Sequence, residues 1–369
     1  MSSLFRLKRA VVVPGYAWSA TTATSCVDPA VRMDERVRDS GAPGLGFDEF
    51  RERAARALSV HAGSLSVEVL NAARDLPDDT LKLLVRKTNG TPSAVILYSG
   101  AGGPDIVRRA TDAARAARSA LGPELGSVAP LPLDEGWLDG RSYAILPFIG
   151  GFSRNRVLRF GQRRWLAPAV FGWLRRATAA TLASPSPQTD AAFQRALLDV
   201  VQRARMPRDL RTAAEDALTR LQGGQWKPRH VLMHGDLWFG NILSQSSNLA
   251  QIATRKFVVI DWPGGRVRGF PIYDLSRLCA SVGSSARRYR SELLAHARIL
   301  GCQARDVEAN LLSALGHIGQ HLEHFPEERY IGMAVQSVHS VRVALADQTL
   351  SRHHGVTPPD VDRTSTVAP

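Results

Sequence analysis

Apolar and polar positions divide the chain into a first half with strand-like patterns and a second half with helical ones. Residues 47–58 open the patterned region with the apolar spacing of a short amphipathic helix. Five strand-like segments and one helical segment follow. The predicted strands are 65–70, 81–88, 93–99, 130–135 and 141–148, and the predicted helix between the third and fourth strands is 105–121. Asn89 and Gly90 join the second and third strands and are a strong hairpin signal, so we expect an antiparallel sheet.

The second half of the chain carries apolar residues at helical spacing over most of its length. The predicted helices are 163–182, 189–206, 207–221, 272–281, 286–300, 305–324 and 327–346. The two halves together predict an α+β fold, with a small sheet-containing part at 47–148 and a larger, mainly helical part at 149–352. We expect an irregular extension at 1–46 and a disordered, Pro- and Thr-rich tail at 353–369.

Composition narrows the class of protein without naming its function. A chain of 369 residues is long enough for two lobes with their own cores. Its three cysteines, Cys26, Cys279 and Cys302, form neither a disulfide framework nor a zinc pattern, which favours a cytoplasmic location. No apolar stretch approaches the length of a membrane span. The formal charge of +13 attracts anions such as nucleotides, but the arginines are spread along the chain and form no block typical of nucleic-acid binding.

The candidate chemistry lies in two apolar stretches between the predicted helices of the second half. The first contains His234, Asp236 and Asn241 in the sequence HGDLWFGN, and the second, FVVIDW, contains Asp261. Phosphoryl transfer needs a carboxylate beside the acceptor oxygen and oxygen ligands that hold Mg²⁺ against the phosphates. In a protein-kinase catalytic loop an Asp takes the acceptor proton and an Asn five residues later binds the metal. We therefore expect Asp236 as the catalytic base and Asn241 and Asp261 as Mg²⁺ ligands.

These segments resemble the aminoglycoside phosphotransferase and choline kinase family. The family signature runs HGD-x-x-x-x-N and then IDW or IDF, and this chain has HGDLWFGNIL, VVIDW and PIYDLSRL in that order. HGDLW is also similar to the related fructosamine kinases. The resemblance implies a bilobal protein-kinase-like fold, with a small antiparallel-sheet N-lobe and a larger, mainly helical C-lobe. It also implies Mg²⁺-dependent transfer of the γ-phosphoryl group of ATP or GTP to a hydroxyl of a small molecule, sugar- or aminoglycoside-like.

The same resemblance assigns supporting roles to residues around the catalytic loop. Residues 145–151, ILPFIGG, resemble the hinge between the lobes, where backbone groups of Leu146 and Phe148 would bind the adenine edge. His234 matches a histidine with a structural role. Asp274 matches an aspartate that braces the catalytic loop, although the first turn of a helix would by itself favour an acid there. Trp238 lies within the catalytic loop, beside the expected acceptor site.

The first half departs from the family at the site for the nucleotide phosphates. A kinase grips the α- and β-phosphates with a lysine on the third strand, paired to a glutamate on the next helix. Here Leu97 or Tyr98 stands near the lysine position, and the predicted helix 105–121 holds no glutamate, with Asp112 its nearest acid. The cations that could substitute are Lys82, Arg86 and Lys87 on the neighbouring strand and Arg108, Arg109 and Arg115 on the helix. The sequence leaves the choice among them open.

Two other functions stay open at the level of sequence. A catalytically silent pseudokinase that binds a nucleotide or another ligand would explain the missing lysine and glutamate. Such a protein has no chemical need of Asp236, Asn241 and Asp261 together, which favours the enzyme. A basic scaffold for nucleic acid or an anionic surface would rest on charge alone, without a recognised motif. The sequence names neither the acceptor nor an oligomeric state.

Three histidines near the C-terminal end form a further pattern. His317, His321 and His324 lie on one helical face at i, i+4 and i+7. Two histidines at i, i+4 can bind zinc on a helix. No further ligand is evident in the sequence, so we expect an amphipathic helix whose histidines line a cleft or core.

Overall fold

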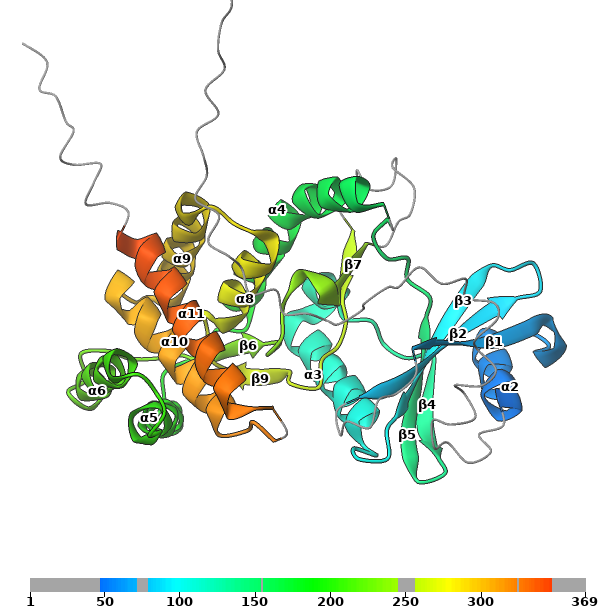
Figure 1. Ribbon diagram of the computed structural model, residues 1–369, viewed down its shortest axis with the longest axis horizontal. Coiled ribbons are helices and arrows are strands. Elements are labelled where there is room, and N and C mark those ends of the chain that lie inside the picture. The colour runs from blue at the N-terminus through cyan, green and yellow to red at the C-terminus, as the bar shows by residue number, and fades with distance from the viewer. Residues whose placement is uncertain (1–46, 72–78, 154, 245–255, 324, 347–369) are drawn as a thin grey trace, which may run out of the picture. The chain divides into compact units, whose positions relative to one another are not determined.

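The computed structural model describes residues 47–346 apart from 72–78, 154, 245–255 and 324. The predicted extension at 1–46 and the predicted tail at 353–369 lie outside these residues. A five-stranded sheet forms the first part of the described chain, in the order β1-β2-β3-β5-β4 (Figure 1). Its strands are β1 (Leu65–Asn71), β2 (Thr80–Lys87), β3 (Pro92–Ser99), β4 (Asp134–Leu138) and β5 (Arg141–Pro147). All neighbouring strands pair antiparallel, as the sequence predicts.

Helices cover both faces of this sheet (Figure 1). α2 (Phe47–Leu58) packs Phe50 edge-on against Tyr98 and Tyr143, with ring centroids 5.2 and 6.4 Å apart. α3 (Ile106–Gly126) packs its first turn against Ala144 and Leu97. Successive residues of a strand point to opposite faces, so Leu97 and Tyr98 belong to different cores.

Of the predicted boundaries that are wrong, two have a clear local reason. The fourth strand begins at Asp134 and not at 130, because Pro130 and Pro132 have no N–H to donate to a ladder. α4 (Arg156–Ala180) begins earlier than the predicted 163. Its cap is Asn155, whose side chain accepts hydrogen bonds from two backbone N–H groups of the first turn at 2.9 and 3.2 Å.

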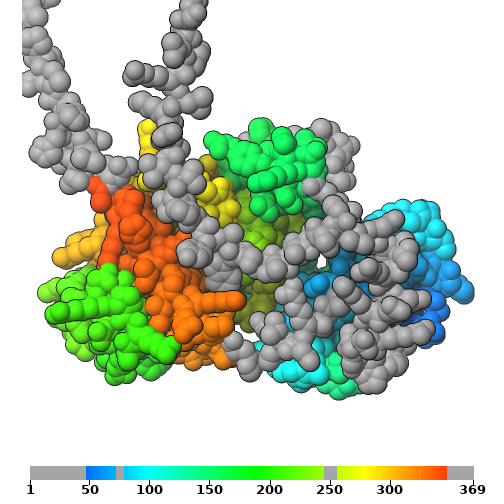
Figure 2. Space-filling model, in the orientation of Figure 1, coloured from blue at the N-terminus to red at the C-terminus, as the bar shows by residue number. Residues whose placement is uncertain are grey.

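Helices make up most of the remaining described chain. They are α4, α5 (Pro187–Gln202), α6 (Arg208–Gln222), α8 (Tyr273–Val282), α9 (Ala286–Leu300), α10 (Ala304–Gly319) and α11 (Glu327–Ala346). α10 contacts α5, α6, α9 and α11, and the atoms of α5, α6, α10 and α11 form one continuous surface in Figure 2. A Cβ on Gly316 of α10 would lie 1.8 Å from the carbonyl oxygen of Ala196 in α5, so only glycine permits this helix contact.

The described residues between α6 and α8 include four short strands. β6 (Val231–Met233) pairs with β9 (Arg266–Gly269), and β7 (Ile242–Ser244) pairs with β8 (Phe257–Val259). The residues of β6 and β8 are fully apolar and buried, and those of β6 pack into the main helical core. α3 contacts β9, so the helix that covers the five-stranded sheet also reaches this region. The loops that connect these strands carry the candidate site.

Candidate active site

The two short ladders present the predicted site residues on adjoining loops. His234, Asp236 and Asn241 lie between β6 and β7, and Asn241 ends a 3-10 turn, η2 (Phe239–Asn241). Asp261 follows the last residue of β8 by two positions. The backbone pairing of β7 with β8 continues beyond the ladder, because the Ile260 N–H donates to the Asn241 carbonyl oxygen at 2.9 Å. The structure therefore places the two predicted metal ligands, Asn241 and Asp261, at the same end of this ladder.

The Asp236 carboxylate is the centre of a polar cluster. One oxygen accepts a hydrogen bond from Arg277 Nη2 at 2.6 Å, and the other accepts one from Asn241 Nδ2 at 3.2 Å. The same Nδ2 donates to the Asp236 carbonyl oxygen at 3.0 Å, which closes the loop on itself. Loss of hydration raises the pKa of the Asp236 carboxyl, while the charge and hydrogen bonds of its partners oppose this rise. The side chain is still 48% exposed, so a hydroxyl group can approach it.

His234 connects the catalytic loop to the strand that leads to Asp261. Its Nδ1 accepts from the Asp236 N–H at 3.2 Å, and its Nε2 lies 3.1 Å from the Ile260 carbonyl oxygen. Since Nδ1 acts as an acceptor, Nε2 carries the proton and donates it to that carbonyl. The ring also packs on Trp262, with centroids 4.5 Å apart. Burial lowers the pKa of His234 to about 4, so the ring is neutral and suited to a structural role.

Asp274 lies in the first turn of α8 and is buried, with its carboxylate turned toward the catalytic loop. Its two oxygens accept from the backbone N–H groups of His234 at 2.5 Å and Gly235 at 3.0 Å. Burial raises the pKa of Asp274 to about 6, and these backbone donors oppose the rise. Gly235 has a φ of 85°, and a Cβ there would lie 2.9 Å from the Gly264 carbonyl oxygen. The glycine of the HGD motif is thus required by the close approach of the loop that follows Asp261.

Asp261 adopts a backbone conformation that few residues tolerate. Its φ is 69°, in the left-handed region, where aspartate is one of the better accepted residues after glycine. Its neighbour Trp262 is buried and donates its indole N–H to the Val259 carbonyl oxygen at 2.8 Å. The anchored tryptophan ties this turn to the end of β8. Asp261 itself is exposed, whereas Asn241 is buried.

The donor set at this point fits Mg²⁺ better than a metal that needs a complete protein cage. Asn241 uses its amide nitrogen on Asp236, so its amide oxygen is the atom that would bind a metal, and Asp261 would add a carboxylate. Mg²⁺ binds through one or two protein oxygens together with waters and phosphate oxygens. Within the described part of the chain, no three His, Cys, Asp or Glu side chains are grouped so that they could hold a metal ion. Asn241 and Asp261 would therefore share the ion with a phosphorylated substrate.

The residues predicted as a hinge lie at the end of β5. Leu146 is half-buried and pairs with Val95 of β3. The Phe148 N–H donates to the Ser93 carbonyl oxygen at 3.0 Å, so this backbone donor is already bonded, and the Phe148 side chain is 38% exposed. Both residues lie where the sheet gives way to the segment that leads into α4.

Arg277 is the site residue that the sequence prediction missed. It lies in α8, three residues after Asp274, and therefore on the same side of the helix. Its guanidinium reaches back to Asp236, with only 16% of its side chain exposed. The spacing within PIYDLSRL could have indicated this residue. If Asp274 contacts the catalytic loop from a helix, the residue at i+3, Arg277, lies on the same side of that helix and faces the same loop.

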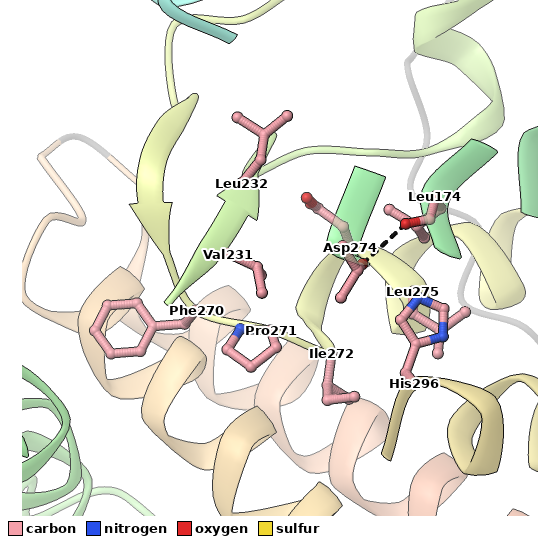
Figure 3. Close-up of a pocket in the computed structure, with 10 residues that line it drawn as sticks. Leu174, Val231, Leu232, Phe270, Pro271, Ile272, Asp274, Leu275 and His296 are labelled. Carbon is pink, nitrogen blue, oxygen red and sulfur yellow. Dashed lines mark hydrogen bonds between the residues drawn. The ribbon is translucent and has the colours of Figure 1, made fainter. Parts of the chain in front are cut away.

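The histidine pattern lies apart from this cluster, and a pocket shares one residue with it. His317 stacks on Phe270 and packs against His321, with ring centroids 4.9 and 4.5 Å apart, while His324 lies outside the described residues. α10 ends at Gly319 and not at 324, so the exposed His321 lies beyond the helix, and only the half-buried His317 packs as predicted. A small pocket is lined by seven apolar residues together with Thr178, Asp274 and the buried His296 (Figure 3). Apart from Asp274, it contains none of the predicted site residues.

Comparison with known proteins places the chain in a family. Two solved structures are similar to it at low identity. One is a thermostable mutant of an aminoglycoside phosphotransferase in ternary complex with AMP-PNP and hygromycin B, with a TM-score of 0.49, 15% identity and coverage of 80% of this chain and 97% of that one. The other is a choline/ethanolamine kinase family protein from Mesorhizobium loti, with a TM-score of 0.45, 15% identity and coverage of 83% and 97%. A comparison with functionally characterised sequences finds no match.

The family assignment itself comes from the sequence match. Residues 97–309 match the APH phosphotransferase enzyme family, a span of more than half of the 369 residues. The matched span begins within β3 and contains the whole catalytic loop, Asp261 and Asp274. The predicted α+β, kinase-like fold is confirmed, and the chain belongs to the APH phosphotransferase enzyme family.

Proposed function

We propose that this chain transfers the γ-phosphoryl group of a nucleoside triphosphate to a hydroxyl of a small molecule. The observation that carries the proposal is the state of Asp236. Its two carboxylate oxygens are bonded to Arg277 and Asn241, yet almost half of its side chain is exposed. A carboxylate held in one orientation but open to solvent is arranged to take a proton from a bound hydroxyl. Family membership supports the same reaction class.

Each residue of the cluster would have a distinct task. Asp236 would orient the acceptor hydroxyl and take its proton as the hydroxyl oxygen bonds to phosphorus. Arg277 would keep the carboxylate oriented and ionised, since a cation beside a carboxylate lowers its pKa. Asn241 and Asp261 would hold Mg²⁺, which, when bound, neutralises charge on the phosphate oxygens. Backbone groups near Leu146 and Phe148 would contact the base.

We propose ATP as the donor and a neutral or anionic, sugar-like molecule as the acceptor. The donor follows from the resemblance of residues 145–151 to an adenine-binding hinge. The acceptor follows from the charge around Asp236: its carboxylate is paired with Arg277, so little negative charge is left to attract a polycation. An aminoglycoside acceptor, rich in ammonium groups, would favour unpaired acids at this point. Sugar-like molecules offer hydroxyls without that requirement.

A pseudokinase is the second candidate, and one observation favours it. The third strand of the sheet offers Leu97 and Tyr98 where a phosphate-binding lysine is expected, and both side chains pack into apolar surroundings. A protein without a grip on the phosphates would bind nucleotide weakly or in an unproductive way.

The cytoplasm is the proposed location. In the described part of the chain Cys279 and Cys302 are free thiols, which suits a reducing compartment. No helix among the described residues combines the length and apolar character that crossing a bilayer requires.

The experiment that separates the two candidates measures phosphoryl transfer and nucleotide binding in parallel. Asp236→Asn should reduce turnover about a hundredfold or more against a panel of hydroxylated acceptors, while ATP affinity changes little. Asp190→Asn, an exposed aspartate in the first turn of α5, is the matched control and should leave both unchanged. Full activity in Asp236→Asn would reject the mechanism. A wild type that binds ATP but phosphorylates no acceptor would favour the pseudokinase.

A further inference from the structure

The side chains of β3 point to opposite faces of the sheet, and neither candidate position offers a cation. Tyr98 packs on Phe50 of α2, and its hydroxyl donates to the Leu138 carbonyl oxygen at 3.0 Å. Leu97 lies on the other face and packs with Val107, at the start of α3, and Ala144. A kinase lysine on the third strand points toward the helix that carries its partner glutamate. The equivalent position here is therefore Leu97, and it makes an apolar contact with α3.

The register of the sheet places a lysine directly beside this position. Lys82 of β2 pairs with Leu97 of β3, which in turn pairs with Ala144 of β5. Residues directly opposite each other in an antiparallel pair point to the same face, with Cβ atoms about 4.5–5.5 Å apart. Lys82 therefore shares the α3-side face with Leu97, displaced from it by a single strand spacing. A lysine side chain is long enough to cover that displacement.

A one-residue irregularity sets this register. The hairpin begins with Arg86 opposite Pro92, and the pairing shifts between Val85 and Arg86. Without the shift, Lys82 would lie opposite Ile96, which faces α2 together with Tyr98. Because a slip of one residue exchanges the two faces of a strand, this bulge is what places Lys82 on the face toward α3.

The other five candidate cations are less suited to a nucleotide phosphate. Arg86 is paired with Glu68 at 2.7 Å. The three candidate arginines of α3 are all engaged: Arg108 with Asp112, Arg109 with Asp105 and Glu323, and Arg115 with Asp112 and Glu135. Lys87 is exposed beside the Asn89–Gly90 turn, at the far end of β2. Lys82 is half-buried and has no ion pair with any residue that the structure describes.

The apolar row next to Lys82 suits the base of the nucleotide. Leu84, Val95 and Leu146 are in register across β2, β3 and β5 on the same face as Lys82, and Leu146 belongs to the predicted hinge. Lys82 lies two residues before Leu84 on β2, about 7 Å from it at the usual rise of a strand. A base held on this row would direct its phosphates toward the Lys82 end of the sheet.

The ion pair between α3 and the sheet has the opposite arrangement of charges from that of a kinase, with the cation on the helix and the acid on the sheet. A kinase pairs a strand lysine with a helix glutamate, whereas here Arg115 of α3 contacts Glu135 of β4 at 2.6 Å. Glu135 pairs with Ala144 and so lies in the same row as Lys82 and Leu97. Because α3 forms its ion pair with Glu135 on β4, Lys82 is not needed to link the helix to the sheet and is available for a ligand.

We propose that Lys82 on β2 binds the phosphates of the nucleotide, in place of the cation that β3 lacks. The inference rests on the proposed function in requiring a nucleotide, and it names the residue of that site which the sequence leaves open. Under this proposal the missing lysine on β3 no longer favours a pseudokinase, because a lysine on the neighbouring strand binds the phosphates instead.

The test compares nucleotides that differ only in their phosphates. Lys82→Met, which keeps an unbranched apolar side chain, should weaken binding of ATP and ADP about tenfold or more, as expected for loss of a charged hydrogen-bond partner. Adenosine should bind as it does to the wild type. Lys87→Met on the same strand is the matched control and should change neither. Thermal unfolding of each variant verifies the fold.

A transfer of the lysine across the strand pair sharpens the test. The double variant Lys82→Leu with Leu97→Lys should recover at least part of the ATP affinity that Lys82→Met loses. Unchanged ATP binding in Lys82→Met, or an equal loss for adenosine and ATP, would overturn the proposal. If the wild type transfers phosphate while Lys82→Met binds ATP normally, only the Lys82 assignment fails. If the wild type binds ATP through Lys82 but transfers nothing, only the proposed catalysis fails, and a wild type that binds no nucleotide overturns both.

Discussion

The catalytic loop and the five-stranded sheet reach their arrangements by different means. In the loop, Asp236 and Asn241 are five residues apart and contact each other directly. In the sheet, Lys82 and Leu97 belong to different strands and meet only through the register of β2 with β3. A short loop can carry its chemistry in the spacing of its residues, whereas a sheet distributes it among strands. A motif search therefore finds the first region and overlooks the second.

The family match has the same asymmetry. It begins at residue 97, within β3, and so includes the loops of the helical part but neither β1 nor β2. If phosphate binding has moved to β2, the part of the site that varies lies outside the matched span. Three predictions, from the largest expected effect to the smallest, test the catalytic-loop region, to be set beside the Lys82 variants that test the sheet.

The largest effect is expected from the loop that follows β8. Asp261→Asn should abolish Mg²⁺-dependent binding of ATP, because it removes the carboxylate from the proposed ion site, while the fold stays intact. Binding is measured by calorimetry with Mg²⁺ and with EDTA, and Asp139→Asn, in the turn between β4 and β5, serves as the control. Unchanged Mg²⁺-ATP affinity in a folded Asp261→Asn would show that the metal assignment is wrong.

An intermediate effect is expected from Arg277, the residue that links α8 to the catalytic loop. Arg277→Met should lower turnover roughly tenfold, because Asp236 loses the partner that orients it. The pKa of Asp236 should rise further without the cation, so the acidic limb of the pH profile of kcat/KM should move to higher pH. Arg287→Met, exposed at the start of α9, is the control. A loss of turnover without a shift of the acidic limb would mean that Arg277 acts only on structure.

The smallest effect is expected on stability and involves His234. Its pKa is lowered to about 4 in the folded protein, so between pH 6.5 and 4 the unfolded chain binds the additional proton and stability falls as the pH falls. His234→Gln should reduce this slope by at most one proton, ~1.4 kcal/mol per pH unit. Denaturant unfolding at several pH values measures it.

Other groups that titrate in the same pH range also contribute to that slope. Asp274 has its pKa raised to about 6, so its contribution has the opposite sign and stability rises as the pH falls through that value. His317, with a pKa lowered to about 4, acts in the same direction as His234. Both groups are present in wild type and variant, so the difference between the two slopes isolates His234. An unchanged slope in His234→Gln would contradict its buried, neutral state.

The sequence alone determined the fold class, most helix boundaries and the residues of the catalytic loop. These features are local: amphipathic spacing specifies a helix, and a loop of eight residues between two apolar strands leaves its polar side chains little freedom to separate. The errors at β4 and α4 came from short-range effects, two prolines and an asparagine cap, that also lie in the sequence. The variants Asp236→Asn and Asp261→Asn test the roles predicted for two of these loop residues.

Only the tertiary structure shows which basic residues lie next to the catalytic loop and next to the position of the missing lysine. Arg277 reaches Asp236 because α8 packs its first turn against the catalytic loop, across 41 positions of the chain. Lys82 lies beside Leu97 because one irregular residue pair, near Val85, shifts the register of β2. Contacts between distant segments depend on packing and on strand pairing, where a shift of one residue reverses the face of every side chain. Six cations that the sequence could not rank are therefore separated by geometry that no local pattern contains.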